Sequence, residues 1–173
     1  MKLTLVGIDL DLVEAWRREF REFDEVTIVH QDITQVATDT VVSPGNSHGW
    51  MNGGIDLVYK HFFGSEIESE VRRTIDILPG KILPVGAGVL VSTKHDKVPY
   101  LILAPTMEEP AEIPEDHAYR AMRAVLRTAA RYPERVKQIF CPGLGTGIGN
   151  IPFAVAAANM ATAYRDWKES LKP

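Results

Sequence analysis

The chain has 173 residues, of which 45% are hydrophobic and 24% are charged, and its formal net charge is −4. This length and composition fit one compact domain, residues 1–173, with a sizeable buried core. A broad nucleic-acid-binding surface is not expected in an acidic chain, because such binding depends on basic side chains that neutralise phosphates.

The few features that report on cellular compartment favour a soluble, cytoplasmic protein. The single cysteine, Cys141, excludes an internal disulfide framework and is compatible with a reducing compartment. The apolar run at the N-terminus is too short for a signal peptide, and no segment approaches the roughly 20 apolar residues that span a bilayer. We therefore expect no membrane association.

In the first half of the chain, β-branched runs alternate with apolar residues at helical spacing, which predicts strands interspersed with helices. The predicted strands are residues 3–6, 26–29 and 40–43, and the predicted helices are 55–63, 66–78 and one that follows Asp9 and buries Val13, Trp16, Phe20 and Phe23. The polar segment 30–39 contains turn chemistry at Asp32 and Thr34.

The second half continues the same pattern. Two neighbouring strands, 89–91 and 100–103, are joined by a polar turn, and a last strand is predicted at 136–140. Two helices bury apolar faces, one made of Ala118, Ala121, Met122, Val125, Leu126 and Ala129, the other of Phe153, Ala157, Met160, Ala161, Tyr164 and Trp167. The stripe Arg120, Arg123, Arg127 and Arg131 is interpreted as a solvated helix face.

Strands and helices interspersed in this order predict an α/β fold, in which a mixed or mostly parallel sheet carries helices on both faces. Ligands of such sheets bind beyond the carboxyl ends of the strands. The loops after Ser43 and after Phe140 contain glycines and polar residues at such strand ends. These two loops are therefore the candidate ligand-binding segments.

Four glycines alternate with other residues between the last strand and the last helix, at Gly143, Gly145, Gly147 and Gly149. Glycine leaves the backbone accessible and permits positive φ, so successive N–H groups can converge on one anion. Pro152 stands where the first turn of the next helix begins, so the positive end of that helix favours a phosphate in this loop. The alternative interpretation is a flexible strand-to-helix turn.

Other site motifs are missing. The glycine loop does not fit G-x-G-x-x-G because residue 150 is asparagine, and no G-x-x-x-x-G-K-[ST] sequence occurs. The five histidines lack metal-ligand spacing, so no metal and no cofactor are expected. No histidine is identified as a partner for a nucleophilic Cys141, which we interpret as a small residue buried at a strand end.

Three segments in the first third of the chain follow one another as Gln31-Asp32-Ile33-Thr34, Val41-Val42-Ser43-Pro44-Gly45-Asn46-Ser47 and Asn52-Gly53-Gly54-Ile55-Asp56. They resemble, in this order, the G-D-I-T, V-N-A-A-N and G-G-G-V-D motifs of the macro domain, the ADP-ribose-binding fold. Asn46 and Asp56 have the spacing of the family's last Asn and Asp. The segment from Gly145 to Pro152 resembles the family's second phosphate loop.

This resemblance implies a three-layer α/β/α sandwich with a mixed central sheet and a cleft for ADP-ribose. The Asp32 carboxylate would accept a hydrogen bond from the adenine amino group close to the Ile33 backbone, and the Asn46 amide would hold the distal ribose. Backbone N–H groups of Gly53, Gly54 and Ile55 on one side, and of Gly145, Thr146, Gly147, Ile148 and Gly149 on the other, would wrap the diphosphate. Ordinary turn residues remain the alternative for Asp32 and Asn46.

Asp56 decides between an enzyme and a binding module. In hydrolytic members its counterpart positions or activates a water that attacks near C1″ of the distal ribose, and a neighbouring diphosphate would raise the pKa of this base. The resemblance thus implies hydrolysis of ester-linked ADP-ribosyl groups, either O-acetyl-ADP-ribose or ADP-ribose on an acidic side chain, with Asp56 and Asn46 as catalytic residues. The alternatives are a non-catalytic reader of ADP-ribose or a related nucleotide, and a phosphatase acting on ADP-ribose 1″-phosphate. A structural alternative for Asp56 is a residue stabilised at a helix N-terminus.

The sequence departs from the family pattern at several positions. Ser43 replaces the first Asn of V-N-A-A-N, and Asn52 replaces the first glycine of the triplet. Gly149 stands where many hydrolases carry an aromatic residue that stacks on the distal ribose. In another macro branch a lysine at the position of Lys60 attacks the ribose, but that branch needs an aspartate where Gly149 or Asn150 stands here. We therefore expect Lys60 to be a surface helix lysine.

Overall fold

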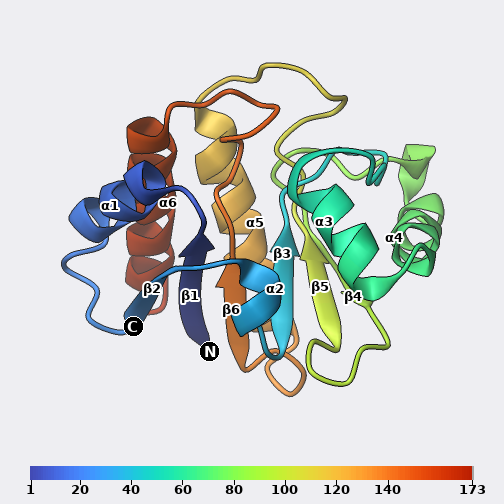
Figure 1. Cartoon of the computed structure of the whole chain (residues 1–173), viewed down its shortest axis with the longest axis horizontal. Coiled ribbons are helices and arrows are strands. Elements are labelled where there is room, and N and C mark those ends of the chain that lie inside the picture. Colours follow the sequence, from blue (N-terminus) through green and yellow to red (C-terminus); the bar gives the residue numbers. More distant parts are fainter. Residues whose placement is uncertain (173) are drawn as a thin grey trace.

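The computed structural model describes residues 1–172. A six-stranded sheet forms its centre in the order β2-β1-β6-β3-β5-β4 (Figure 1). All neighbouring strands run parallel except β4, which is antiparallel to β5. The strands are β1 Lys2–Gly7, β2 Val26–His30, β3 Thr40–Ser43, β4 Val89–Ser92, β5 Tyr100–Leu103 and β6 Gln138–Cys141. The expected mixed sheet is confirmed.

Helices cover both faces of this sheet, which confirms the three-layer α/β/α architecture (Figure 1). They are α1 Leu10–Glu19, α2 Ile33–Val36, α3 Gly54–Phe63, α4 Glu66–Asp76, α5 Asp116–Arg131 and α6 Phe153–Ser170, together with the single 3₁₀ turn η1 Pro79–Lys81. Helices α1, α5 and α6 pack on one face, and α2, α3 and α4 lie over the other.

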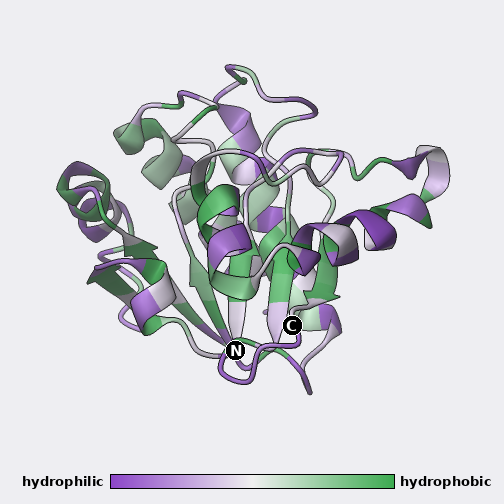
Figure 2. Ribbon diagram, turned by 45° about the vertical axis from the view of Figure 1, so that its right-hand side comes forward, coloured by the Kyte–Doolittle hydropathy of each residue, from purple (hydrophilic) through white to green (hydrophobic). Residues whose placement is uncertain are grey.

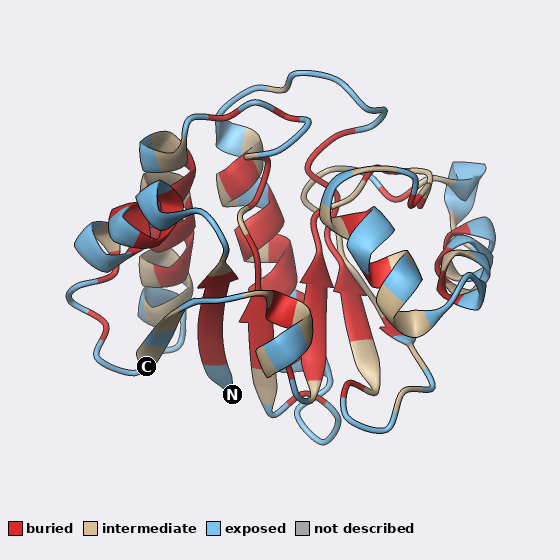
Figure 3. Cartoon of the chain, viewed as in Figure 1, coloured by how far each residue is buried: buried red, intermediate tan, exposed pale blue. Residues whose placement is uncertain are grey.

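The hydrophobic core is split by the sheet into two clusters. Successive side chains of a strand point to opposite faces, so Val42 contributes to the cluster beneath α1, α5 and α6, and Val41 to the cluster beneath α3 and α4. The strands are accordingly mostly hydrophobic, with polar residues at some of their ends (Figure 2). Buried residues concentrate in the strands and on the sheet-facing sides of the helices (Figure 3). Cys141 is fully buried at the end of β6, as expected.

The structure differs from the sequence prediction mainly at element ends. The polar segment 30–39 holds a one-turn helix, α2, because the Asp32 carboxylate caps it by accepting the Thr34 N–H at 2.8 Å. Helix α4 ends at Asp76 rather than at residue 78, and β6 is shifted toward Cys141. Pro152 is the N-cap of α6 and not its first helical residue.

The strand order explains where a ligand site forms. β1, β6 and β3 are neighbours and run parallel, so their carboxyl ends meet at one edge of the sheet. The loops that follow Gly7, Ser43 and Cys141 therefore converge there. No helix within residues 1–172 is long and apolar enough to cross a membrane.

Candidate functional site

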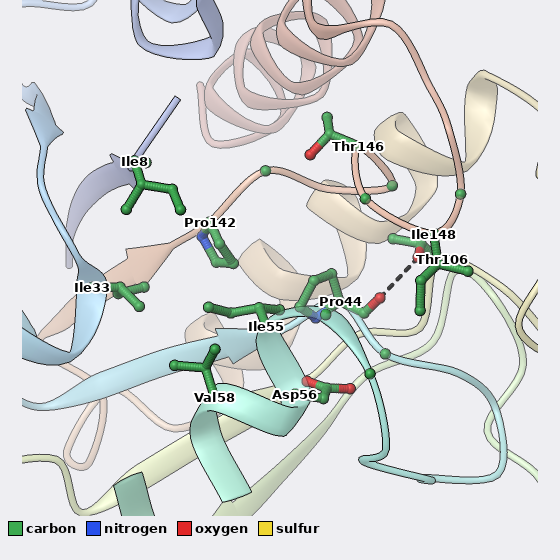
Figure 4. A pocket seen from close by; sticks show the side chains of 18 of the residues that line it. Ile8, Ile33, Pro44, Ile55, Asp56, Val58, Thr106, Pro142, Thr146 and Ile148 are labelled. Carbon is green, nitrogen blue, oxygen red and sulfur yellow. Dashed lines mark hydrogen bonds between the residues drawn. The ribbon is translucent and has the colours of Figure 1, made fainter. Parts of the chain in front are cut away.

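A cavity of about 550 Å³ opens at this edge of the sheet (Figure 4). Its size falls within the range of about 300–1,000 Å³ that is usual for small-molecule sites. Apolar side chains form much of the wall, and Ile8, Ile33, Ile55, Val58 and Pro142 surround it in Figure 4. No lysine or arginine of the described chain lines it. An anionic ligand would therefore depend on backbone N–H groups and helix termini for its charge neutralisation.

The glycine-rich loop at residues 143–149, which we call the second loop, forms one wall of the cavity, and several of its backbone N–H groups have no acceptor in the described chain. Within residues 1–172, no group accepts a hydrogen bond from the backbone N–H of residues 145–149. The loop keeps its shape through other bonds, since Ile151 N donates to Gly145 O at 2.9 Å and Asn150 N donates to Gly147 O at 3.0 Å. Gly145 has φ +75°. The alternating glycines thus leave a row of backbone N–H groups without an acceptor among the described residues, as an anion site requires.

The opposite wall is the N-terminal turn of α3. Gly53 is its N-cap and Gly54 and Ile55 follow, so their N–H groups have no carbonyl of the helix to bind. The Ile148 side chain of the second loop extends toward this turn. Its Cδ1 lies so close to Gly53 that a Cβ added there would be only 3.1 Å from it. The residues predicted to wrap the diphosphate are therefore brought together on two sides of one cavity.

Asp56 lies in the first turn of α3 and is only 5% exposed, yet it lines the cavity. Ser43, the last residue of β3, donates its hydroxyl to Asp56 Oδ1 at 2.6 Å. Asp56 Oδ2 lies against the backbone of Gly45, where a Cβ would come within 2.3 Å of it. The carboxylate is thus fixed between the end of β3 and the loop that follows.

The environment of Asp56 favours its neutral form. Burial raises the pKa of Asp56 to about 7, the hydrogen bond from Ser43 opposes this rise, and the negative charge of Glu68 adds to it. A carboxyl group that titrates near neutral pH beside a cavity is suited to accept a proton from a bound water. Its place in the first turn of α3 is also compatible with the helix-terminus interpretation of Asp56.

Replacing Asp56 with asparagine should stabilise the protein most above pH 7. Because the pKa in the folded protein is about 7 and the ordinary value is 3.8, the free energy of unfolding of the native protein falls as pH rises between these values. Asparagine does not ionise and avoids this loss, which amounts to a few kcal/mol at about 1.4 kcal/mol per pKa unit. Denaturant unfolding at about pH 5 and about pH 8 measures the gain, which should be larger at the higher pH. If the substitution changed the free energy of unfolding equally at both pH values, the raised pKa of Asp56 would be contradicted.

Asn46 lines the cavity, but its amide is largely engaged in its own loop. Its Oδ1 accepts the N–H groups of His48 and Trp50, each at 3.1 Å, and its Nδ2 donates to Trp50 O at 2.9 Å. One N–H of Nδ2 is left for a ligand. Most of the hydrogen-bonding capacity of the Asn46 amide therefore stabilises its own loop, and only one N–H can bind a ligand.

The two residues predicted to contact adenine, Asp32 and Ile33, both line the cavity. Asp32 Oδ1 accepts both the N–H and the hydroxyl of Thr34 at 2.8 Å, whereas Oδ2 contacts no donor among the described residues. Ile33 is buried beside it and lines the cavity. Asp32 is thus both a helix cap and a half-buried acceptor at the cavity wall.

Lys60 lies outside the cavity. It forms an ion pair with Glu68 of α4 and is 3.5 Å from Asn52 Oδ1. No group of three His, Cys, Asp or Glu residues placed to hold a metal ion occurs in residues 1–172. The position of Lys60 does not support a role for it as a nucleophile in the cavity.

The sequence alone does not predict that Ser43 is the hydrogen-bond partner of Asp56, nor which residues form the end of the cavity near Trp50. In the sequence Ser43 stands out only as a departure from the family pattern, although a buried hydroxyl at a strand end near a candidate catalytic Asp is a usable signal. Trp50, Thr106, Met107 and Pro110 also line the cavity. They come from loops that are distant in the sequence and that only the pairing of β3 with β5 brings together.

Comparison with known proteins agrees with this geometry. Residues 42–160 match the family model of the macro domain, and the chain belongs to the macro domain family. An uncharacterized protein of Aquifex aeolicus is 39% identical to it over 145 residues, which are 83% of each chain.

Two better-described proteins are more distant. The mouse (Mus musculus) ADP-ribose glycohydrolase MACROD1 is 23% identical over 99% of this chain and 52% of its own length. The Oceanobacillus iheyensis macrodomain, solved with ADP, superposes with a TM-score of 0.66 at 22% identity and covers 79% of this chain and 72% of that one. At this identity the structural likeness establishes the fold.

Proposed function

We propose that this domain binds ADP-ribose in the cavity and hydrolyses ester-linked ADP-ribosyl groups, with Asp56 as the general base. The observation that carries the proposal is the position of Asp56, a carboxyl group with a pKa of about 7, beside a cavity whose two walls present unpaired N–H groups. The substrates would be O-acetyl-ADP-ribose or ADP-ribose on an acidic side chain.

The parts of ADP-ribose would lie along the cavity in a definite order. Adenine would lie among the apolar side chains near Ile33, with its amino group donating to Asp32. The diphosphate would lie between the turn at residues 53–55 and the loop at residues 145–149. The distal ribose would then reach Asn46 and Asp56. Solved relatives support this choice of ligand, since the Oceanobacillus iheyensis macrodomain has been solved with ADP and, in a mutant form, with ADPR.

The chemistry requires one proton acceptor. A water bound beside the distal ribose transfers a proton to the Asp56 carboxylate as its oxygen forms a bond to carbon. In ADP-ribose on an acidic side chain that carbon is C1″, and the bond from C1″ to the side-chain carboxylate breaks. In O-acetyl-ADP-ribose it is the acyl carbon, and the bond from that carbon to the ribose oxygen breaks. The products are free ADP-ribose and the acid. The proton on Asp56 then passes to the leaving oxygen or to solvent. By donating to Oδ1, the Ser43 hydroxyl fixes the orientation of the Asp56 carboxylate and stabilises its ionised form.

Turnover of defined substrates tests the proposal. The purified domain is incubated with O-acetyl-ADP-ribose, with a peptide carrying ADP-ribose on glutamate, and with ADP-ribose 1″-phosphate, and products are identified by mass spectrometry. Release of ADP-ribose from either ester is the expected result. Release of phosphate alone would indicate the phosphatase. No release from any substrate, with ADP-ribose still raising the melting temperature, would indicate a reader.

A further inference from the structure

The loop that follows β3 is built around Trp50. All three hydrogen bonds of the Asn46 amide within the loop serve its fold, and two of them hold the Trp50 backbone, one to its N–H and one to its carbonyl. The His48 ring stacks on the Trp50 indole with centroids 4.4 Å apart and an interplanar angle of 14°. The indole is therefore presented in a fixed position.

A second segment fixes this loop from outside. Asn46 pairs with Met107 as an isolated parallel bridge, and Ser47 N donates to Met107 O at 2.9 Å. Trp50, Met107 and Pro110 all line the cavity, and we call these three residues the distal shelf. The bonds that hold the shelf together use backbone atoms and the Asn46 amide. His48 covers one face of the half-buried indole, and no other ring and no hydrogen bond engages the indole within residues 1–172, so its second face is available to a ligand.

The distal shelf lies at the end of the cavity away from Asp32. Asp32 follows β2 at one edge of the sheet, whereas Met107 and Pro110 follow β5 on the other side of β3. Figure 4 shows the same separation, with Ile33 on one side of the cavity and Thr106, the neighbour of Met107, on the other. A ligand that runs from Asp32 to Asp56 would thus point its far end at the shelf.

Charge restricts what the shelf can accept. No basic side chain lines the cavity of the described chain, and Oε1 of the exposed Glu109 lies 3.8 Å from Nε2 of His48, the ring that stacks on the indole. An anionic group would find no partner here. A flat ring that is neutral or positively charged would gain both stacking on tryptophan and a favourable field.

We propose that the distal shelf binds a planar, neutral or cationic ring carried on the distal ribose of ADP-ribose, so that the cavity also binds ADP-ribose conjugates with an aromatic substituent. This assignment rests on the proposed ADP-ribose site and adds to the hydrolysed esters a second class of ligand, which the cavity binds through a ring on the distal ribose. The Trp50 indole is the stacking surface, Met107 and Pro110 are its apolar border, and Asn46 is the positioning residue that holds it.

Titration calorimetry with two ligands tests this subsite separately from catalysis. NAD⁺ is ADP-ribose that carries a planar cationic nicotinamide ring at C1″, and ADP-ribose lacks that ring. The native protein should bind NAD⁺ at least as tightly as ADP-ribose. Trp50→Ala should weaken NAD⁺ binding about tenfold, the effect of losing one ring-on-aromatic stack, and change ADP-ribose binding little. Trp50→Phe should restore most of the NAD⁺ affinity.

Several outcomes would overturn the inference. If the native protein bound ADP-ribose but clearly not NAD⁺, the shelf would not accept a ring. If Trp50→Ala weakened both ligands equally, the indole would contact the ribose or support the loop instead. Failure of the native protein to bind ADP-ribose would overturn the proposed function itself. Tyr132, an exposed aromatic residue at the end of α5, provides the control, since Tyr132→Ala should change neither dissociation constant.

Discussion

Replacing Asp56 with asparagine should lower the rate of ester hydrolysis by about 10²–10⁴-fold, the contribution of a positioned general base. The amide is close in size to the carboxyl group and can still accept the Ser43 hydroxyl, so the fold and the affinity for ADP-ribose should be kept. Turnover of O-acetyl-ADP-ribose by mass spectrometry, with calorimetry of ADP-ribose in parallel, measures both. An unchanged rate would remove Asp56 from the chemistry.

The pH dependence of the same reaction provides an independent check. Only the carboxylate form of Asp56 accepts a proton, so the rate of the native protein should rise with pH and level off above about 7. The hydrogen bond from Ser43 lowers the pKa of Asp56. Ser43→Ala should therefore move the rising limb to higher pH and recover rate in alkaline buffer. If the pH–rate profile of Ser43→Ala did not shift from that of the native protein, Ser43 would not act through the pKa of Asp56.

A methyl group added at Gly149 should disrupt the second loop and weaken ADP-ribose binding at least about tenfold, which corresponds to about 1.4 kcal/mol. A Cβ at this position would lie 2.7 Å from the carbonyl oxygen of Gly145 and 2.7 Å from Ile113 Cδ1. A backbone oxygen cannot move aside without changing the loop, so Gly149→Ala should also reduce the free energy of unfolding by about 1–3 kcal/mol. Calorimetry and denaturant unfolding measure the two effects.

Gly147 offers the matched control in the same loop. A Cβ on Gly147 would meet nothing within 4 Å, so Gly147→Ala should leave the free energy of unfolding nearly unchanged. Equal destabilisation by the two substitutions would mean that the loop depends on glycine for flexibility and not for space. The crowding at Gly149 also explains why this position carries no aromatic side chain here.

Most of the fold could be predicted because the signals are local. Each buried strand is a short apolar run, and the long helices have clear apolar faces, so their order and the layered α/β class follow from pattern alone. Helix α2 escapes such a prediction because four residues are too few for periodicity, and its cap, Asp32, also fits an ordinary turn. The end of α4 is predicted too late because the apolar residues Ile77 and Leu78 continue the helical pattern beyond Asp76.

The candidate site could be predicted only where it lies in continuous motifs. Asp32, Asp56 and the two glycine loops each belong to a short recognisable segment. The bond between Ser43 and Asp56, and the distal shelf of Trp50, Met107 and Pro110, depend on which strands are neighbours in the sheet. The amide of Asn46 shows the limit most clearly, since a residue expected to face the ribose forms most of its bonds with its own loop.

A crystal structure of the protein with bound ADP-ribose would test the central claim most directly. The account predicts adenine beside Asp32, the diphosphate between residues 53–55 and 145–149, and C1″ of the distal ribose facing Asp56, with one ordered water between them. A ligand bound outside this cavity, or one whose distal ribose points away from Asp56, would contradict it.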